Sequence, residues 1–201
     1  MRKPIYISRT YFPPLKEYNK YLKRIWDNNI LINNGELVQE LEEKLRVRFG
    51  VKHVVCVANG TSALSISARA LGIRDRIYVS PNSFIATVSS MVWDGIKPIF
   101  VDFDEEYKSP ALVTHLYGVP EMTKASPVIY DASHAFMGKY KGKSILSYGD
   151  VSAISFSAVK IFQSGEGGAV VTNNDEIADK ARWMRNYGYK DRYSFHGAGM
   201  N

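Results

Sequence analysis

The sequence predicts an α/β fold, and two observations lead to that prediction. Segments in which apolar residues recur at spacings of three and four alternate with short, continuous apolar runs. The first pattern is typical of amphipathic helices and the second of buried strands. The chain has 201 residues, 45% of them hydrophobic and 23% charged, which is enough for one domain with a hydrophobic core.

The N-terminal half is expected to begin with two helices, over 15–25 and 37–49. The second helix places Val38, Leu41 and Leu45 on one face. The elements that follow are, in order, a strand over 53–57, a helix over 62–71, a strand over 77–79, a helix over 85–93 and a strand over 98–101.

The C-terminal half is expected to contain further strands and one helix. Strands are predicted over 128–130, 153–156 and 169–172, and the last pairs with a neighbour after the glycine-rich turn at 165–168. Asp175 is predicted to cap a final helix that ends near residue 187.

Residues 102–128 fit this series poorly. Parallel strands need a crossover of about a dozen residues, usually helical. Few residues separate Val101 from Val113, or Leu116 from Val128. Helix-breaking residues also occur there, namely Pro110, Gly118, Pro120 and Pro127. Either these crossovers are irregular loops, or the sheet is smaller than the alternation suggests.

The net charge of +6 and the single cysteine bear on the class of function. Lys and Arg are scattered, and their densest stretch (Lys139, Lys141, Lys143) is expected to be a turn, so nucleic-acid binding is not predicted. The charge is interpreted as attraction for small anions such as a cofactor phosphate or a nucleotide diphosphate. Cys56 forms no intrachain disulfide, which suits the cytoplasm. No membrane helix and no metal site are expected.

Three short motifs indicate the chemistry. Lys160 lies in a loop of small residues, where a partly apolar setting favours an amine that forms Schiff bases. Asp131 closes an apolar strand, and a carboxylate there suits the ring nitrogen of a pyridine. Gly60, Thr61 and Ser62 open a helix, where backbone amides favour a phosphate. Each motif also has a structural interpretation, as a solvated lysine, a turn cap or a helix cap.

Together, and in this order, the motifs resemble the pyridoxal-phosphate aminotransferases of fold type I, and most closely the DegT/DnrJ/EryC1/StrS family, which aminates nucleotide-linked keto sugars. The resemblance covers nearly the whole chain, including residues 13–18, 34–42 and 140–149. It implies a three-layer α/β/α sandwich with a mostly parallel central sheet. It also implies that 1–201 form a single large domain that binds pyridoxal 5′-phosphate, with an N-terminal helical region at about 13–50.

The resemblance assigns roles to individual residues. Lys160 would form the Schiff base and then shuttle a proton, and Asp131 would pair with the protonated pyridine nitrogen. Phe84 would stack on the ring, and His134 would lie near its phenolic oxygen. The phosphate would be bound by Gly60, Thr61, Ser62, Ser155 and, from the neighbouring subunit, Asn201.

The implied function is a transferase of deoxysugar and polysaccharide biosynthesis, which moves an amino group from an amino acid, L-glutamate, to a nucleotide-linked keto-deoxy sugar. The detail is most similar to the branch that acts on dTDP-linked 4-keto-6-deoxyhexoses. Lys160 argues against the related dehydratases, which carry His at that position. Two alternatives stay open: a non-catalytic remnant that binds the cofactor or dimerises with a full-length relative, and a plain α/β ligand-binding domain whose motifs match by chance.

Two departures from the family bear on turnover. Family members continue beyond the Gly-x-Asn motif, here Gly199 to Asn201, into a small C-terminal domain that closes over the substrate, and this chain is expected to lack it. Residues 102–128 also lack two helical crossovers. Aromatic residues in the N-terminal region predict a homodimer, because a monomer would leave them uncovered. They are Tyr6, Tyr11, Phe12, Tyr18, Tyr21 and Trp26.

Overall fold

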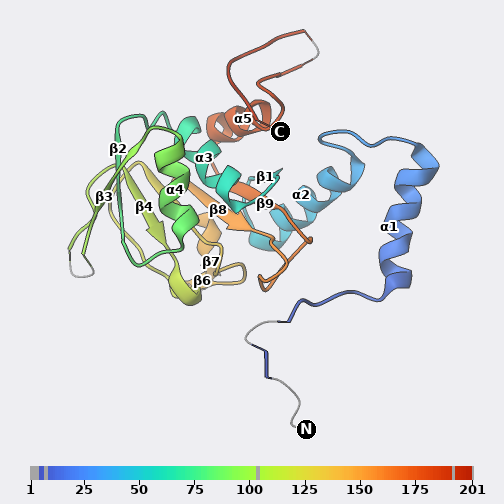
Figure 1. Cartoon of the computed structure of the whole chain (residues 1–201), viewed down its shortest axis with the longest axis horizontal. Helices are drawn as coiled ribbons and strands as arrows, with labels where there is room; N and C mark the ends of the chain where they lie inside the picture. The colour runs from blue at the N-terminus through green and yellow to red at the C-terminus, as the bar shows by residue number, and fades with distance from the viewer. Residues whose placement is uncertain (1–4, 7–8, 103–104, 192, 201) are drawn as a thin grey trace.

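A computed structural model of the chain describes residues 5–6, 9–102, 105–191 and 193–200. Its centre is a seven-stranded sheet with the strand order β1-β9-β8-β5-β4-β2-β3 (Figure 1). The strands are β1 (His53–Val57), β2 (Arg76–Val79), β3 (Lys97–Phe100), β4 (Ala111–Thr114), β5 (Val128–Asp131), β8 (Val151–Ser155) and β9 (Gly168–Thr172).

Most neighbouring strands of this sheet are parallel. β3, β2, β4, β5 and β8 form a parallel series, and β9 runs antiparallel to both β8 and β1. The carboxyl ends of β4, β5 and β8 therefore meet at one edge, with Thr114 opposite Asp131 in the register. Because helices also pack on the sheet, the predicted sandwich with a mostly parallel sheet is confirmed.

Three helices cover one face of the sheet: α3 (Gly60–Ala70), α4 (Ile85–Trp93) and α5 (Asp175–Met184). α3 is built largely from Ala, Ser and Gly, and eight of its 11 residues are buried, so its backbone lies close to the strands. Asn59 caps this helix, since its side-chain oxygen accepts a hydrogen bond from the Ser62 N–H at 2.8 Å. The cap fixes where the helix begins, at the edge where the parallel strands end.

The opposite face is covered in part by α2 (Glu36–Phe49). Leu45 and Phe49 of this helix pack in a core cluster with Ile154 and Val171 of the sheet. The helix ends at Gly50, whose φ of 65° allows its N–H to bond to carbonyls of the last turn. Both amphipathic helices predicted in the N-terminal region are present, although only α2 packs on the sheet.

A short hairpin leads into a 3-10 turn whose Ile145 and Leu146 cover a further part of that face. β6 (Lys139–Tyr140) pairs with β7 (Lys143–Ser144), and the 3-10 helix η2 (Ile145–Ser147) follows. Lys141 and Gly142 both have positive φ, which matches the tight turn of a two-residue hairpin. The turn predicted for this lysine-rich stretch is therefore confirmed.

The crossovers from β3 to β4 and from β4 to β5 are irregular loops. Within the described part of both, the only helical element is the 3-10 turn η1 (Leu116–Gly118). Tyr107 and Met122 from these loops pack over Val113 and Val128 of the sheet. Since the sheet keeps its strands here, the first of the two alternatives for this region is correct.

The final helix differs slightly from the prediction. Asn174, not Asp175, is the N-cap, because its side-chain oxygen accepts two backbone N–H groups of the first turn. Asp175 is the first helical residue and pairs with His53 at 2.7 Å. The helix ends at Met184 rather than near 187, and Tyr187 takes a left-handed conformation with a φ of 55°.

α1 (Leu15–Asn28) stands apart from the sheet, at the right of Figure 1. None of its residues is buried, and Trp26 is 76% exposed. Arg24 joins it to α2 through ion pairs with Glu36 and Glu40. Exposed ion pairs contribute little stability, so these pairs attach α1 only weakly to α2. In the described ranges, no helix combines the length and apolar character needed to cross a membrane.

Candidate active site

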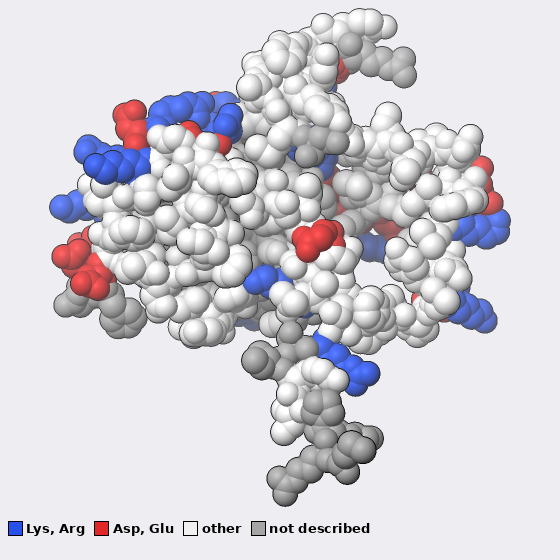
Figure 2. All heavy atoms as spheres, in the orientation of Figure 1, with Lys and Arg blue, Asp and Glu red and all other residues white. Residues whose placement is uncertain are grey.

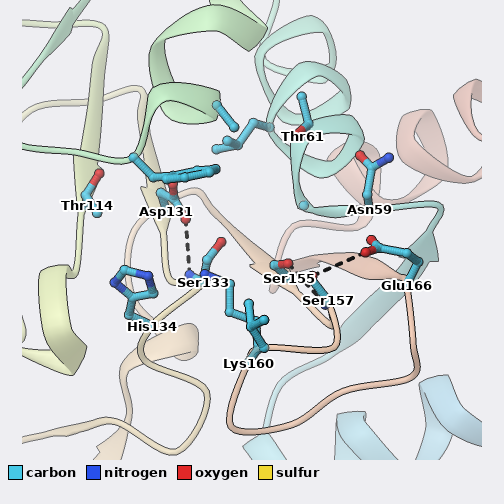
Figure 3. Close-up of a pocket in the computed structure, with 15 residues that line it drawn as sticks. Asn59, Thr61, Thr114, Asp131, Ser133, His134, Ser155, Ser157, Lys160 and Glu166 are labelled. Atoms are coloured by element: carbon cyan, nitrogen blue, oxygen red, sulfur yellow. Dashed lines mark hydrogen bonds between the residues drawn. The ribbon is translucent and has the colours of Figure 1, made fainter. Parts of the chain in front are cut away.

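A cavity of about 380 Å³ lies where the carboxyl ends of β5 and β8 meet the first turns of α3 and α4 (Figure 3). Asp131 is the last residue of β5 and Ser155 the last of β8. Gly60 begins α3, and Phe84 directly precedes α4. Ligands of open α/β sheets gather at this edge, since strand ends and helix starts converge there.

Seven of the residues that the sequence proposes line this cavity together: Gly60, Thr61, Phe84, Asp131, His134, Ser155 and Lys160. Ser62 does not line this cavity. It lines a second cavity, beside Cys56 and Arg185. Successive helical residues point about 100° apart, so a helix start that presents Thr61 turns Ser62 away. The phosphate contact of Ser62 stays a prediction from the sequence. Asn201 lies outside the described residues.

Asp131 is held in one orientation by two hydrogen bonds. The residue is only 4% exposed. Its Oδ2 accepts from the hydroxyl of Thr87 at 2.7 Å, and its Oδ1 accepts from the Ser133 N–H at 3.1 Å. Thr87 is itself fully buried in α4. A carboxylate has about four lone-pair sites, so Asp131 can accept a further hydrogen bond from a ligand without moving.

Lys160 is the one lysine among the described residues that lines the cavity. In Figure 3 its side chain rises from the loop below into the cavity. Its Nζ lies 5.9 Å from the centroid of the Phe84 ring, within the range of a cation–π interaction. The Phe84 ring is 63% exposed and stands at the mouth, so the amine has an aromatic neighbour on one side and the open cavity on the other.

The loop that carries Lys160 is anchored on both sides. On the inner side, Phe162 stacks on Phe136 at 4.4 Å and meets Phe156 edge-on at 5.2 Å. On the outer side, Gln163 donates a hydrogen bond to the Tyr11 carbonyl at 2.6 Å. The N-terminal segment therefore rests on this loop and restricts its movement.

The start of α3 lies at one end of the cavity. Backbone N–H groups at a helix start attract a phosphate, and the hydroxyls of Thr61 and Ser155 are beside them. A Cβ on Gly60 would lie 2.9 Å from the Cβ of Ser155, and one on Gly168 would lie 2.5 Å from the Asn59 backbone. Glycine at both positions is thus needed for α3 to approach β8 and β9 so closely.

His134 lies at the other end of the cavity. Burial lowers its pKa, and the nearby positive charge of Lys160 lowers it further. Its Nδ1 is buried and has no hydrogen-bond partner among the described residues. The ring lies parallel to that of Tyr117, with centroids 6.3 Å apart. Near neutral pH this histidine is therefore a neutral ring with a nitrogen available to a ligand.

Sequence reasoning missed several cavity residues, and the polar ones are Asn59, Thr114, Ser133, Ser157 and Glu166. Ser157 donates a hydrogen bond to Glu166 at 3.2 Å across the glycine-rich turn. Thr87 was also missed, and no sequence pattern points to it, because its contact with Asp131 joins residues 44 positions apart. Thr114 ends an apolar strand as Asp131 does, which is a signal that could have found it.

These residues fit a flat pyridine that carries a phosphate arm. The helix start suits the phosphate, Asp131 suits the ring nitrogen, and Lys160 is an amine for an aldehyde carbon. Two buried polar atoms of lining residues, Thr114 Oγ1 and His134 Nδ1, have no partner among the described residues. Orphaned polar atoms at a cavity wall indicate a polar ligand. Pyridoxal phosphate carries a chemical group suited to each of these residues.

Comparison with known proteins agrees with the geometry. The sequence matches the DegT/DnrJ/EryC1/StrS aminotransferase family over residues 15–125 and 121–201. It is 38% identical to dTDP-4-amino-4,6-dideoxy-D-glucose transaminase from Shigella dysenteriae, over all of this chain and 61% of that protein. It is 34% identical to GDP-perosamine synthase from Escherichia coli O157:H7, over 89% of this chain and 56% of that protein. The chain thus spans 56–61% of the length of these relatives.

Solved structures give the same result for the fold. A structure of DesI in the presence of its TDP-sugar product superposes with a TM-score of 0.90 at 27% identity, over 100% of this chain and 57% of that one. AtS13 from Actinomadura melliaura superposes with a TM-score of 0.86 at 26% identity, over 98% of this chain and 63% of that one. The predicted fold type I is confirmed.

Proposed function

The chain belongs to the DegT/DnrJ/EryC1/StrS aminotransferase family, whose members depend on pyridoxal 5′-phosphate, and from that premise we propose its reaction. The reaction is transfer of an amino group from an amino acid, L-glutamate, to a nucleotide-linked keto-deoxy sugar. The observation that carries the proposal is the meeting of Lys160, Asp131 and the start of α3 around one cavity.

The proposed work of each residue follows from its position. When bound, pyridoxal phosphate supplies an electron sink that stabilises negative charge on the carbon beside the amino group. Lys160 Nζ would hold the cofactor and, once released from it, would remove and return the substrate proton. Asp131 would accept a hydrogen bond from the protonated ring nitrogen, and its fixed orientation would help to keep that nitrogen charged.

For the acceptor we propose a dTDP-linked 4-keto-6-deoxyhexose. The relative at 38% identity is named for a dTDP-linked 4-amino-4,6-dideoxy sugar, and the DesI structure contains a TDP-sugar product. The net charge of +6 favours the approach of such a doubly anionic substrate. A cytoplasmic location belongs to the proposal, because a single cysteine suits a reducing compartment.

We propose a homodimer whose contact surface includes the mouth of the cavity. Apolar side chains at or near the mouth are strongly exposed, among them Phe84, Ile85, Tyr117, Val159 and Ile161. Figure 2 shows one face of the molecule on which most charged side chains lie at the rim and the middle is largely uncharged. The exposed side of α1 adds further apolar surface. A second copy would cover this surface and close the cavity.

A second candidate is a non-catalytic chain that binds the cofactor or pairs with a longer relative. The observation in its favour is that the chain spans 56–61% of its relatives, while seven of the proposed cofactor-binding residues line one cavity. The two candidates share cofactor binding and differ in turnover.

Absorbance spectroscopy separates the two candidates. The protein mixed with pyridoxal phosphate should show a visible band that depends on Lys160 and disappears on borohydride reduction. Adding L-glutamate should convert this band if the chain is an aminotransferase. A band that glutamate leaves unchanged would favour a non-catalytic chain that binds the cofactor. A protein without any such band would contradict the aminotransferase and leave only a chain that pairs with a longer relative.

A further inference from the structure

We propose that Thr114 is a cofactor-binding residue, whose hydroxyl acts with His134 to hold the 3-oxygen edge of the pyridine ring. The inference rests on the proposed function and adds a residue to its site. Thr114 ends β4, and the register places it directly opposite Asp131 on the neighbouring strand.

The first observation is an unsatisfied hydroxyl in the cavity wall. Thr114 is 7% exposed and lines the cavity, yet its Oγ1 has no hydrogen-bond partner among the described residues. Buried hydroxyls normally find a partner, because leaving one unpaired is unfavourable. His134 Nδ1, in the same wall, is unsatisfied as well. Two such atoms at one end of a cavity point to a shared polar ligand group.

The second observation is the order of residues around the cavity. In pyridoxal phosphate the aldehyde carbon lies opposite the ring nitrogen, with the phosphate arm on one side of it and the 3-oxygen on the other. Figure 3 places Thr61 and Ser155 on one side of Asp131 and Lys160, and Thr114 and His134 on the other. With the nitrogen at Asp131, the aldehyde carbon at Lys160 and the phosphate at α3, the edge that bears the 3-oxygen faces Thr114 and His134.

The chemistry of the two side chains suits that edge. The ring carries a methyl group beside the 3-oxygen, and threonine offers both an O–H donor and a methyl. His134, neutral because burial and Lys160 lower its pKa, offers one N–H donor. Each donor would stabilise negative charge on the 3-oxygen. Together they would complete the hydrogen bonding of an edge that neither Asp131 nor Lys160 reaches.

This arrangement has a spectroscopic consequence. The 3-oxygen and the nitrogen that joins Lys160 to the cofactor compete for a proton. Hydrogen bonds donated to the 3-oxygen lower the affinity of that oxygen for the proton. Removing one donor makes the oxygen a better partner for the protonated nitrogen. The visible band should then persist to higher pH, so the pH at which it is half converted should rise.

The chain offers a matched control. Ser152 in β8 is also fully buried, and its Oγ also lacks a partner among the described residues, but it does not line the cavity. Ser152→Ala therefore removes an orphaned hydroxyl of the same sheet without touching the site. Any effect that comes from orphaned hydroxyls in general would occur in both variants, whereas a cofactor contact would be lost only at Thr114.

The experiment is a pH titration of the visible band in the cofactor-loaded protein, together with a titration of the cofactor-free protein with pyridoxal phosphate. In Thr114→Val the midpoint should rise by about one pH unit, and the dissociation constant should rise about tenfold, as for loss of one hydrogen bond to a charged group. Thr114→Ser should stay near the parent protein, and Ser152→Ala should not shift the midpoint. Thr114→Ala gives the same comparison if the valine variant folds poorly.

An unchanged midpoint in both Thr114→Val and Thr114→Ala would overturn the inference while leaving the proposed function intact. An equal shift in Ser152→Ala would also overturn it, since the effect would then not come from the cavity. If the parent protein shows no Lys160-dependent band at all, the proposed function fails and this inference fails with it.

Discussion

The two halves of the sheet differ in how fully they are covered. Around β5, β8 and β9, the buried helix α3 lies on one face and α2 with its aromatic neighbours on the other. Around β4, the crossovers are irregular loops, and half-buried side chains such as Tyr107 and Met122 cover one face. Most of the cavity belongs to the fully covered half, and Thr114 comes from the other. Shortened crossovers are thus compatible with a cavity lined by seven of the residues proposed from the sequence.

The largest expected effect comes from the fully covered half. Lys160→Ala should abolish both the visible band and transamination, because no other described lysine lines the cavity. Lys143→Ala, in the hairpin outside the cavity, is the matched control and should keep the band. The measurement is absorbance of each variant with added pyridoxal phosphate. A band that survives in Lys160→Ala and is still reduced by borohydride would show that another lysine forms the Schiff base.

Asp131→Asn should keep the cofactor but lower the transamination rate by about 10²- to 10³-fold, as for loss of one preorganised electrostatic contact. A neutral amide cannot hold the ring nitrogen in its protonated form. Steady-state rates with L-glutamate and the keto sugar measure this, beside a binding titration to show that the cofactor is retained. Rates equal to those of the parent protein would mean that the partner of the ring nitrogen lies elsewhere.

Stability measurements compare the two halves directly. Leu64→Ala removes a buried side chain of α3 and should lower the free energy of unfolding by about 2–5 kcal/mol. Met122→Ala removes a half-buried side chain of the second crossover and should lower it by about 1 kcal/mol. Urea denaturation of both variants tests the difference. Equal losses would show that the loops of the second half are packed as firmly as α3.

A further expected effect is a pH dependence of stability located at β4. His115 is fully buried against Tyr130, and burial lowers its pKa to about 4, with Asp131 opposing the shift. Because the unfolded chain binds this proton near pH 6.5, the stability that the neutral ring contributes is present above that pH and is lost as the pH falls towards 4.

The free energy of unfolding should therefore drop by about 2 kcal/mol between pH 7 and pH 5 on account of this residue. Denaturation of the parent protein and of His115→Asn at both pH values measures how much of this loss of stability comes from His115. If the two proteins lose the same amount, other groups cause the dependence.

The sequence predicted the fully covered half better than the other. Asp131, Ser155 and Lys160 could be placed because each ends or follows a continuous apolar run, and such runs end at one edge of a parallel sheet. Thr114 was missed because its strand lies between two short, proline-containing crossovers. These crossovers did not fit the alternation of helices and strands predicted for the rest of the chain.

Neighbouring residues with similar side chains were the other source of error. Asn174 and Asp175 can both cap a helix, and only the backbone geometry selects the first. Thr61 and Ser62 can both bind a phosphate, and the direction of each side chain on α3 separates them. The pattern of α1 predicted its helix, and its aromatic residues predicted apolar surface that a monomer leaves uncovered, which the exposed Tyr18, Tyr21 and Trp26 of α1 confirm.

The central claim is that Lys160 is the residue that holds the cofactor, in the cavity formed by Asp131 and the start of α3. Borohydride reduction of the protein with bound pyridoxal phosphate, followed by proteolysis and mass spectrometry of the peptides, tests it most directly. We expect a single pyridoxyl modification, on Lys160. A modification on a different lysine, or modification spread over several surface lysines, would contradict it.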